Sequence, residues 1–427
     1  MRFLFLTQFY PPEVGATQNR VSDLAERLAR AGHDVTVLTS MPNYPQGKIF
    51  EGYRGRFAME EDSGGVRILR VWTYATNSLG LGARLFSYLS YTVAAAIMAL
   101  AKGGQHDVLY VESPPLFLGI TGIVVSRWRK SKLLFNVTDL WPASAVALGI
   151  LRNPTAIRVA TSLERFIYNR ADIITGQTEG IVEGVKERAP DVPVSLVMNG
   201  VSPEAFATPS AAREQRRNEF GFGDCFVVGY AGRHGIAQGL ETVLHAAEIM
   251  SDQRDIQFAF FGDGPEKNKL LKLGQLSGLR NVHFFPPKPA SEMRAILACF
   301  DAAVVPLKKL DLFHGALPSK LFECMAAGIP VIVSIEGEAK RLVEKANGGI
   351  TIAPEDPQAM ANAILSLKNN PELRRTLGQN GREYTLSHCS RQRAADAIEH
   401  LSSSSVLGNP YPKPITQLPS DPDRIES

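Results

Sequence analysis

A glycine-rich turn in the second half of the sequence contains residue types that could bind an anion. Residues 229–235 (GYAGRHG) follow an apolar stretch that predicts a strand. Glycines such as Gly232 allow backbone N–H groups to approach an anion, and the helix expected next would point its positive end at the same place. Arg233 adds a planar fork of donors suited to phosphate, and His234 lies beside it. A plain tight turn is the alternative interpretation.

A second anion-binding pattern lies at residues 317–323 (LPSKLFE), where Pro318 and Ser319 open a predicted helix. The first helical turn has free N–H groups and the positive end of the macrodipole. The cation of Lys320 is therefore unfavourable there unless an anion binds. Glu323 follows three residues later on the same helix face and could accept hydrogen bonds from ligand hydroxyls. A surface ion pair between Lys320 and Glu323 is the alternative.

Two more acidic positions follow predicted strands. Gly262, Asp263 and Gly264 precede Pro265, which suits the first position of a helix. Asp263 could contact a ligand or cap that helix. Asp139, within residues 136–142 (NVTDLWP), could present a carboxylate to a ligand or act as a helix N-cap.

These turns are positioned by a repeated alternation of short apolar strands and amphipathic helices, which predicts parallel sheets covered on both faces. We expect strands at residues 2–7, 35–39, 108–111, 133–137, 173–175 and 194–198, and then at 226–230, 257–261, 282–285, 302–305 and 331–334. Because the pattern restarts near residues 200–222, we expect two α/β domains at 1–203 and 204–385. A helix at 386–402 is expected to return to the first domain, and residues 403–427, rich in Ser and Pro, are expected to be disordered. Two such domains place a cleft between them, with ligands at the carboxyl ends of the strands.

Composition excludes several classes of protein. The 46 Lys and Arg nearly balance the 43 Asp and Glu, and the net charge of +3 argues against a nucleic-acid partner held by phosphate contacts. The four cysteines are far apart in the sequence, which indicates free thiols and neither a zinc ribbon nor a disulfide scaffold. The apolar run within residues 1–7 is too short for a signal peptide, so we expect none.

One apolar segment could contact a membrane. Residues 85–101 form an uncharged stretch of 17 residues between Arg84 and Lys102. Three interpretations remain open: a spanning helix, a buried core helix, or a helix at a membrane surface. The basic segment 127–132 (RWRKSK) would suit contact with an anionic membrane surface, and a solvated turn is its alternative.

The order and spacing of several motifs over residues 1–402 resemble the family 4 glycosyltransferases. The motifs are FYPPEVG at 9–15, GHDVTV at 32–37, NYP at 43–45, SPPL at 113–116, DLWP at 139–142, NGV at 199–201, GDGP at 262–265 and PSKLFE at 318–323. In detail the chain is most similar to the bacterial branch that builds lipid-linked surface polysaccharides, such as the N-acetylfucosaminyl-type transferases of O-antigen or capsule synthesis.

The resemblance implies the GT-B fold: α/β, with two Rossmann-like doubly wound parallel-sheet domains facing a central cleft. It implies a retaining, metal-independent transfer from a nucleotide sugar without a cofactor, with UDP preferred and GDP still open. The resemblance matches Arg233 to the arginine that binds the donor pyrophosphate. It matches Glu323 to the second glutamate of an E-x7-E motif, which binds the ribose, and Gly15 to the loop glycine near the donor. Asp139 occupies the region of a cleft-facing acidic residue.

Two positions depart from the family pattern. Gln238 stands where many relatives have a phosphate-binding lysine, and Gly315 stands where the first glutamate of E-x7-E is expected. We expect Lys320 to supply the missing positive charge. The expected catalytic residues are Arg233, Lys320 and Asp139, and the expected donor-binding residues are Gly15, Gly232, His234, Gly262, Asp263, Gly264, Pro318, Ser319 and Glu323.

The expected acceptor is a polyprenyl-diphosphate-linked saccharide, and the expected location is the cytoplasm, at the cytoplasmic face of the inner membrane if residues 85–101 touch it. Two other functions remain open. A sugar-nucleotide epimerase of the same fold would turn over without an acceptor. A catalytically inactive homologue, acting as a binding or scaffold protein, is suggested by the glycine at position 315.

Overall fold

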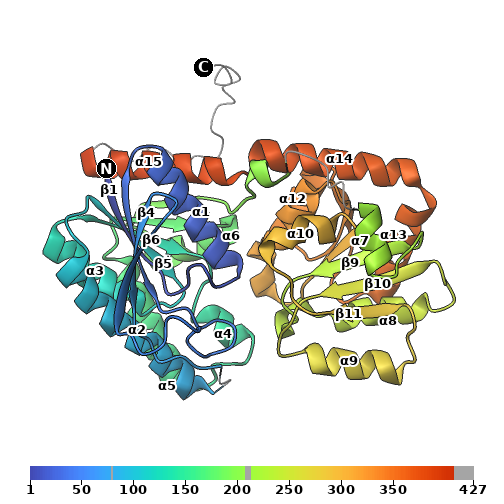
Figure 1. Cartoon of the computed structure of the whole chain (residues 1–427), viewed down its shortest axis with the longest axis horizontal. Helices are drawn as coiled ribbons and strands as arrows, with labels where there is room; N and C mark the ends of the chain where they lie inside the picture. The colour runs from blue at the N-terminus through green and yellow to red at the C-terminus, as the bar shows by residue number, and fades with distance from the viewer. Residues whose placement is uncertain (78–79, 207–212, 408–427) are drawn as a thin grey trace, which may run out of the picture. The chain divides into compact units, whose positions relative to one another are not determined.

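The computed structural model describes residues 1–77, 80–206 and 213–407, and its internal contacts divide the chain into two α/β units. Unit 1 comprises residues 1–198 and 394–427, and unit 2 comprises residues 199–393. We expected domains ending at residues 203 and 385. Figure 1 labels many of the elements of each unit, and the two units are described separately below.

Unit 1 is built on an eight-stranded sheet in the order β3-β4-β2-β1-β5-β6-β7-β8. Its strands are β1 (Arg2–Leu6), β2 (Asp34–Ser40), β3 (Ala58–Ser63), β4 (Val66–Val71), β5 (Val108–Ser113), β6 (Lys132–Val137), β7 (Ile173–Gly176) and β8 (Val194–Leu196). All neighbouring strands are parallel except the β3–β4 hairpin. Sequence analysis missed this hairpin because the outer strand (AMEEDS) is acidic, as an exposed sheet edge tolerates.

Helices cover both faces of this sheet. They are α1 (Ala16–Arg30), α2 (Leu81–Lys102), α3 (Leu118–Arg129), α4 (Ala143–Ala147), α5 (Pro154–Tyr168), α6 (Glu179–Arg188) and α15 (Arg391–Leu407). One apolar cluster joins α2, α3, α5 and α6 to the sheet, and another joins α1 and α15 to the opposite face. In α1, Val21, Leu24, Ala25 and Leu28 are buried, as their spacing predicts.

The helix α2 is a core helix along one of its faces. Tyr91, Ala95 and Ala99 are fully buried, and the Tyr91 hydroxyl lies 2.6 Å from the carbonyl oxygen of Thr7 and 2.9 Å from that of Leu38. By length and composition alone, residues 82–102 are also the one stretch within the described chain that could cross a membrane. The structure therefore places this segment in the helical layer of unit 1.

The helix α15 corrects the expected start of the disordered tail. Residues 403–407 are helical, although the serine run 402–405 suggested a polar tail. Ser402 and Ser405 are buried on the same helix face as Leu401, so packing against unit 1 overrides the weak helix preference of serine. Residues 408–427 lie outside the described chain.

Unit 2 is built on a six-stranded, fully parallel sheet in the order β11-β10-β9-β12-β13-β14. Its strands are β9 (Phe226–Ala231), β10 (Ile256–Phe261), β11 (Val282–Phe285), β12 (Ala302–Pro306), β13 (Val331–Ser334) and β14 (Gly349–Thr351). Its helices are α7 (Arg213–Glu219), α8 (Glu241–Ile249), α9 (Lys267–Leu276), α10 (Ala290–Leu297), α11 (Ser319–Ala326), α12 (Glu338–Ala346), α13 (Pro357–Asn369) and α14 (Pro371–His388), with short 3-10 turns η1 (Pro203–Phe206), η2 (Ile236–Gln238) and η3 (Asp311–Gly315). The two parallel-sheet α/β units confirm the expected fold class.

Each sheet reverses its direction of growth beside one central strand. In unit 2, β9 lies between β10 and β12, and in unit 1, β1 lies between β2 and β5. Loops leaving the carboxyl ends of the strands on either side of such a point turn to opposite faces of the sheet and leave room for a ligand. The loops after β9 and β1 carry Arg233 and Gly15, respectively.

Candidate active site

Lys320 is held at the start of α11, against the turn that follows β9. Pro318 is the N-cap, with extended backbone, so the helix begins at Ser319. The Lys320 ammonium lies 4.0 Å from the ring centroid of Tyr230 and donates a hydrogen bond of 2.5 Å to its hydroxyl. A Cβ on Gly232 would lie 3.0 Å from the same nitrogen. The ammonium is thus pinned between the turn and the helix N-terminus.

The electrostatics around Lys320 favour an anionic ligand. Burial lowers the pKa of Lys320 to about 8, and Cys324 and Glu323 oppose this shift. Burial also raises the pKa of Glu323, against the attraction of Arg391 and Lys320. Among the described residues no ion pair joins Lys320 to Glu323, so the surface ion-pair interpretation is wrong. A cation that opposes the helix macrodipole and forms no direct ion pair within the described residues is stabilised when an anion binds.

Tyr230 connects both expected cationic residues and was missed by sequence analysis. Its hydroxyl donates a hydrogen bond of 2.6 Å to the carbonyl oxygen of Arg233 and accepts one from Lys320. The Arg233 side chain itself is exposed. The available signal was an aromatic hydroxyl three residues before Arg233, but nothing in the sequence indicates that it meets residue 320.

Two glycine turns, after β9 and after β10, pack against each other at the carboxyl edge of the unit 2 sheet. Gly262 has a φ of +144°, and a Cβ there would lie 1.9 Å from the carbonyl oxygen of Gly232. The His234 N–H donates to the carbonyl oxygen of Asp263 (2.8 Å). A Cβ on Gly264 would lie 2.3 Å from the carbonyl oxygen of His234. The expected residues 232–234 and 262–264 are therefore brought together.

Asp263 and the helix after it differ from expectation. The side chain of Asp263 is exposed and accepts a hydrogen bond of 2.8 Å from the N–H of Gly264. The helix α9 begins at Lys267 with Glu266 as N-cap, so Asp263 does not cap the helix and Pro265 is not its first residue. Residues 262–264 pack against the turn after β9, and the helix therefore begins two residues later than expected.

His234 faces the interior of unit 2. Its side chain is 0% exposed, and its ring packs near Tyr230, Phe260 and Phe284. Burial lowers the pKa of His234 to about 4, and the nearby charges of Lys267 and Lys320 act in the same direction. The ring packs in the core beneath the turn after β9. Any contact of His234 with the sugar donor would therefore come from its backbone.

The two positions that depart from the family pattern have local roles. The Gln238 side-chain oxygen accepts a hydrogen bond of 3.1 Å from the N–H of Gly235 and so closes the turn η2. Gly315 ends η3 and brings no side chain to this edge. Besides Lys320 and Arg233, Lys267 brings a positive charge to these turns, since its ammonium donates a hydrogen bond of 2.8 Å to the carbonyl oxygen of Gly262.

Gly15 and Asp139 lie in unit 1, in loops after β1 and β6. Gly15 is the N-cap of α1 with extended backbone, and a Cβ there would meet the side-chain oxygen of Gln18 at 2.4 Å. Asp139 accepts a hydrogen bond of 2.7 Å from Ser144, and burial raises its pKa. The N-cap of α4 is Pro142, so the interpretation of Asp139 as a helix cap is wrong.

A buried polar network near these loops was not predicted. Glu112, the second-last residue of β5, pairs with Arg20 of α1 and accepts a hydrogen bond of 2.9 Å from Asn136. Asn136 in turn accepts one of 2.8 Å from Thr175. The network ties α1, which follows the Gly15 loop, to three neighbouring strands.

Glu13 joins the loops after β1 and β2. Its carboxylate accepts hydrogen bonds from the N–H groups of Tyr10 (3.3 Å), Asn43 (2.7 Å) and Tyr44 (2.7 Å). Burial raises the pKa of Glu13 to about 7. Residues so far apart in sequence offered no signal of this contact.

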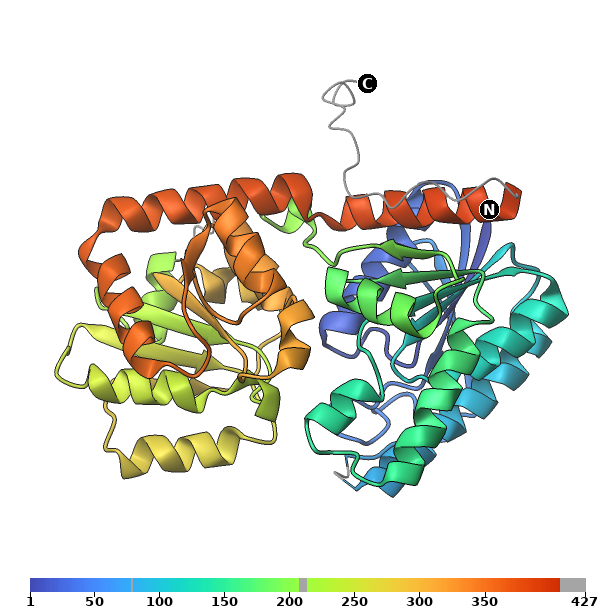
Figure 2. The ribbon, with the colours of Figure 1, turned by 180° about the vertical axis from the view of Figure 1, so that it is seen from behind.

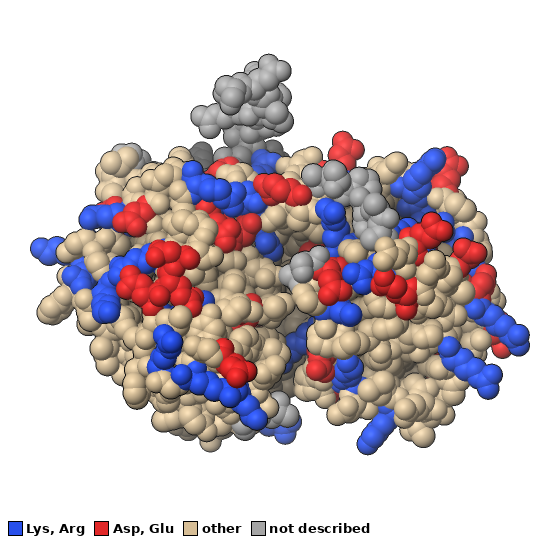
Figure 3. All heavy atoms as spheres, viewed as in Figure 1, with Lys and Arg blue, Asp and Glu red and all other residues tan. Residues whose placement is uncertain are grey.

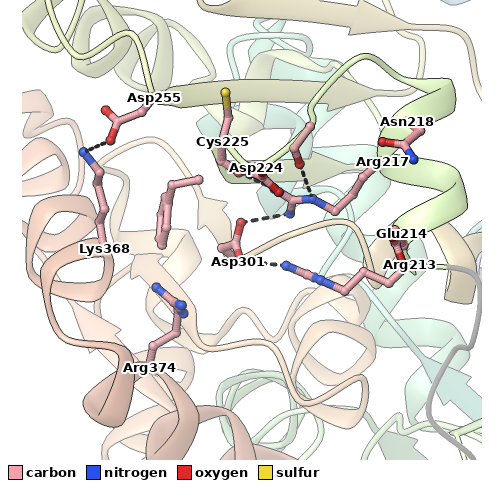
Figure 4. A pocket seen from close by; sticks show the side chains of 12 residues that line it. Arg213, Glu214, Arg217, Asn218, Asp224, Cys225, Asp255, Asp301, Lys368 and Arg374 are labelled. Carbon is pink, nitrogen blue, oxygen red and sulfur yellow. Dashed lines mark hydrogen bonds and ion pairs between the residues drawn. The ribbon is translucent and has the colours of Figure 1, made fainter.

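A cavity of about 680 Å³ lies at the opposite edge of the unit 2 sheet, beside the first residues of β9, β10 and β12 (Figure 4). Asp301 pairs there with Arg213 (2.7 Å) and Arg217 (3.1 Å). Lys368 pairs with Asp255 at 2.6 Å. Because these charged side chains pair with one another, we interpret the residues around the cavity as a structural ion-pair network. Within the described chain, no group of three His, Cys, Asp or Glu residues could hold a metal ion.

Comparisons with known proteins agree with this arrangement. The family described as "Glycosyl transferase 4-like domain" matches residues 15–200, and the family "Glycosyl transferases group 1" matches residues 212–384. These matches and the fold together define a glycosyltransferase with the GT-B fold. More narrowly, the chain is a glycosyltransferase of the family 4 type.

Individual relatives are distant but cover most of the chain. The putative colanic acid biosynthesis glycosyl transferase WcaI of Escherichia coli is 26% identical over 85% of this chain and 91% of its own length. Among solved structures, sucrose-phosphate synthase of Thermosynechococcus elongatus has a TM-score of 0.76 at 20% identity, covering 96% of this chain and all of its own. Anabaena HepE, solved in complex with UDP-glucose, has a TM-score of 0.69 at 18% identity, covering 95% of this chain and all of its own.

Proposed function

We propose that the protein transfers a sugar, with retention of configuration and without a metal, from a nucleotide sugar to a polyprenyl-diphosphate-linked saccharide. In this proposal the donor is a UDP-linked N-acetylated amino sugar. The reaction belongs to bacterial surface polysaccharide synthesis and takes place in the cytoplasm or at the cytoplasmic face of the inner membrane. The name of WcaI, a glycosyltransferase of colanic acid biosynthesis, supports the assignment to surface polysaccharide synthesis, and the UDP-glucose complex of HepE supports the choice of a UDP-linked donor.

The observation that carries the proposal is the half-buried ammonium of Lys320 at the N-terminus of α11, beside the Gly232–Arg233 turn. During transfer the bond between the anomeric carbon and the diphosphate oxygen breaks, and its electron pair stays on the diphosphate. Lys320, Arg233 and the helix N–H groups would stabilise this growing negative charge. The acceptor hydroxyl oxygen bonds to the anomeric carbon from the same face, and its proton passes to the departing phosphate oxygen.

Nucleic acid is not part of the proposal. On the face seen in Figure 3, Lys and Arg side chains are interspersed with Asp and Glu over both units. A nucleic-acid partner held by phosphate contacts needs a concentrated basic surface.

Thermal unfolding with UDP, GDP and a panel of their sugars tests the donor. A ligand present at a hundredfold excess over its dissociation constant stabilises the folded state by about 2.7 kcal/mol. We expect UDP and one UDP-sugar to raise the melting temperature, and a response to GDP alone would contradict the choice of nucleotide.

Transfer assays with a short-chain polyprenyl-diphosphate saccharide test the reaction. The double variant Arg233→Ala/Lys320→Ala should lose transfer, whereas unchanged turnover would refute the stabilisation of the leaving group. Treatment with EDTA should leave the rate unchanged. Conversion of the sugar nucleotide without an acceptor would instead indicate an epimerase, and donor binding without turnover would indicate an inactive homologue.

A further inference from the structure

The helices α2, α3 and α5 of unit 1 expose large apolar side chains on the side away from the sheet. In α2 these include Phe86, Val93 and Ile97, the last of which is 65% exposed. In α3 they include Val124 and Trp128, which is 73% exposed. Val159 of α5 is also exposed. We call the solvent-facing side of these three helices, marked by these six residues, the apolar helical face.

The three helices form one layer, so their exposed sides point the same way. Thr121 of α3 donates a hydrogen bond of 2.9 Å to the carbonyl oxygen of Thr92 in α2, and Arg129 donates another to that of Leu100. The helix α5 packs against α3, and all three share one apolar cluster on the same sheet face. Figure 2 shows this layer from behind. The opposite sides of the helices are buried in the core, so among the described residues these six side chains face away from the sheet and toward solvent.

The exposed charges of this layer have a single sign. The charged residues of α2, α3 and α5 are Arg84, Lys102, Arg127, Arg129, Arg158 and Arg165, together with Glu164. Glu164 is 1% exposed and pairs with Arg188 of α6. Every exposed charge that these helices contribute is therefore basic, which complements an anionic surface.

We propose that the apolar helical face docks into the headgroup region of an anionic lipid bilayer. The exposed Ile, Val, Phe and Trp side chains enter the boundary between headgroups and acyl chains, and the Lys and Arg side chains contact lipid phosphates. The helix α2 does not span the bilayer in this arrangement, because Tyr91, Ala95 and Ala99 remain in the protein core. The inference rests on the proposed function, since a lipid-linked acceptor requires the enzyme to meet the membrane.

Flotation of the full chain with lipid vesicles tests the proposal. We expect binding to vesicles of phosphatidylcholine with phosphatidylglycerol, and at least about tenfold weaker binding to phosphatidylcholine alone. The double variant Ile97→Glu/Val124→Glu should lose at least about tenfold in affinity for the anionic vesicles. As matched controls, Phe57→Glu and Leu276→Glu change side chains that are 82% and 86% exposed but lie outside the three helices. These controls should bind like the wild type.

Trp128 offers a direct readout of insertion. Its emission should shift to the blue on binding and be quenched by brominated lipids, and Trp128→Phe should remove most of this signal. Absence of wild-type binding, or equal binding by the Ile97→Glu/Val124→Glu variant, would overturn the proposal. Concentration-dependent self-association that this variant abolishes would also overturn it and would identify a second copy as the occupant.

Failure of docking and failure of the proposed function are distinguishable. UDP affinity, measured by calorimetry without lipid, should be the same in the wild type and in Ile97→Glu/Val124→Glu. Vesicle binding without any sugar transfer would retain the docking inference and reject the transferase proposal. Transfer to a lipid-linked acceptor with no vesicle binding would retain the transferase proposal and reject the docking inference.

Discussion

At the scale of single residues, the charge and position of Lys320 carry most of the proposed chemistry. Burial lowers its pKa to about 8, so its charge changes over an experimentally accessible pH range. The Tyr230 hydroxyl holds the ammonium at the N-terminus of α11 and also holds the carbonyl oxygen of Arg233. The charge of Lys320 can therefore be tested by changing the pH, and its placement by changing Tyr230.

The affinity for UDP should depend on the protonation of Lys320. The ammonium is charged below pH 8 and loses its proton above it, so UDP should bind about tenfold more weakly at pH 9 than at pH 7. The neighbouring Tyr230 and Cys324 remain neutral over this range, because burial raises the pKa of both side chains. Calorimetric titration of UDP at pH 7, 8 and 9 measures the effect.

The matched variant for this prediction is Lys320→Arg, whose guanidinium stays charged throughout the range. Its UDP affinity should be nearly independent of pH between 7 and 9. A flat profile in the wild-type protein would contradict the assignment of Lys320 to the donor phosphates.

Tyr230→Phe should lower kcat by about 10- to 100-fold, because a hydrogen bond to a charged group contributes about 1.5–3 kcal/mol. The ring remains, so the fold should change little. Loss of the acceptor oxygen also disfavours the ammonium, so the midpoint of the UDP pH profile should move to lower pH. Tyr91→Phe, another buried tyrosine bonded to backbone carbonyls but in unit 1, is the control. An unmoved midpoint would leave Tyr230 with a structural role only.

At the scale of elements, the site depends on two glycine turns that follow β9 and β10. Neither turn is a regular element, and each is shaped by the other through the Gly262–Gly232 and Gly264–His234 contacts. Sequence analysis predicted both turns from their glycines. It placed the start of α9 two residues early, because that start depends on the packing between the turns.

Gly262→Ala should destabilise unit 2 and weaken UDP binding, because the new Cβ would lie 1.9 Å from a backbone oxygen at a φ of +144°. The control Gly278→Ala also changes a glycine of positive φ (+64°), but nothing lies within 4 Å of its Cβ position. It should cost only about 1–2 kcal/mol of backbone strain and leave UDP affinity unchanged. Urea unfolding followed by circular dichroism and UDP calorimetry compare the two. Equal effects on UDP affinity would show that the turn contact has no functional role.

At the scale of the whole molecule, the chain leaves unit 1 after residue 198 and returns at residue 394 as α15. Within unit 2 the two ends of this excursion lie side by side, since the N–H of Val201 donates to the carbonyl oxygen of Cys389 and the N–H of Arg391 donates to that of Val201. Unit 1 is thus completed by a segment about 200 residues away in the chain. Ile398 of α15 belongs to the same apolar cluster as Phe3 and Val35.

Ile398→Ala should therefore lower the free energy of unfolding of unit 1 by about 2–5 kcal/mol. All three tryptophans (Trp72, Trp128 and Trp141) lie in unit 1, so tryptophan fluorescence in urea reports this unit directly. The half-exposed Val406 on the same helix is the control, and Val406→Ala should change stability by less than about 0.5 kcal/mol. Equal stabilities of the two variants would mean that α15 is not part of the unit 1 core.

The sequence by itself determined the alternation of strands and helices, the two α/β units and the two anion-binding turns. These features arise from local periodicity and from residues adjacent in the chain. Other features depend on contacts between distant segments of the chain. These are the acidic strand β3, the helical serines of α15, the inward-facing ring of His234 and the buried Glu112 network. The clearest case is the hydrogen bond between Lys320 and Tyr230, which are 90 positions apart. Only the tertiary structure decided this pairing, because a parallel sheet brings the carboxyl ends of β9 and β12 together while leaving no trace of that neighbourhood in either segment alone.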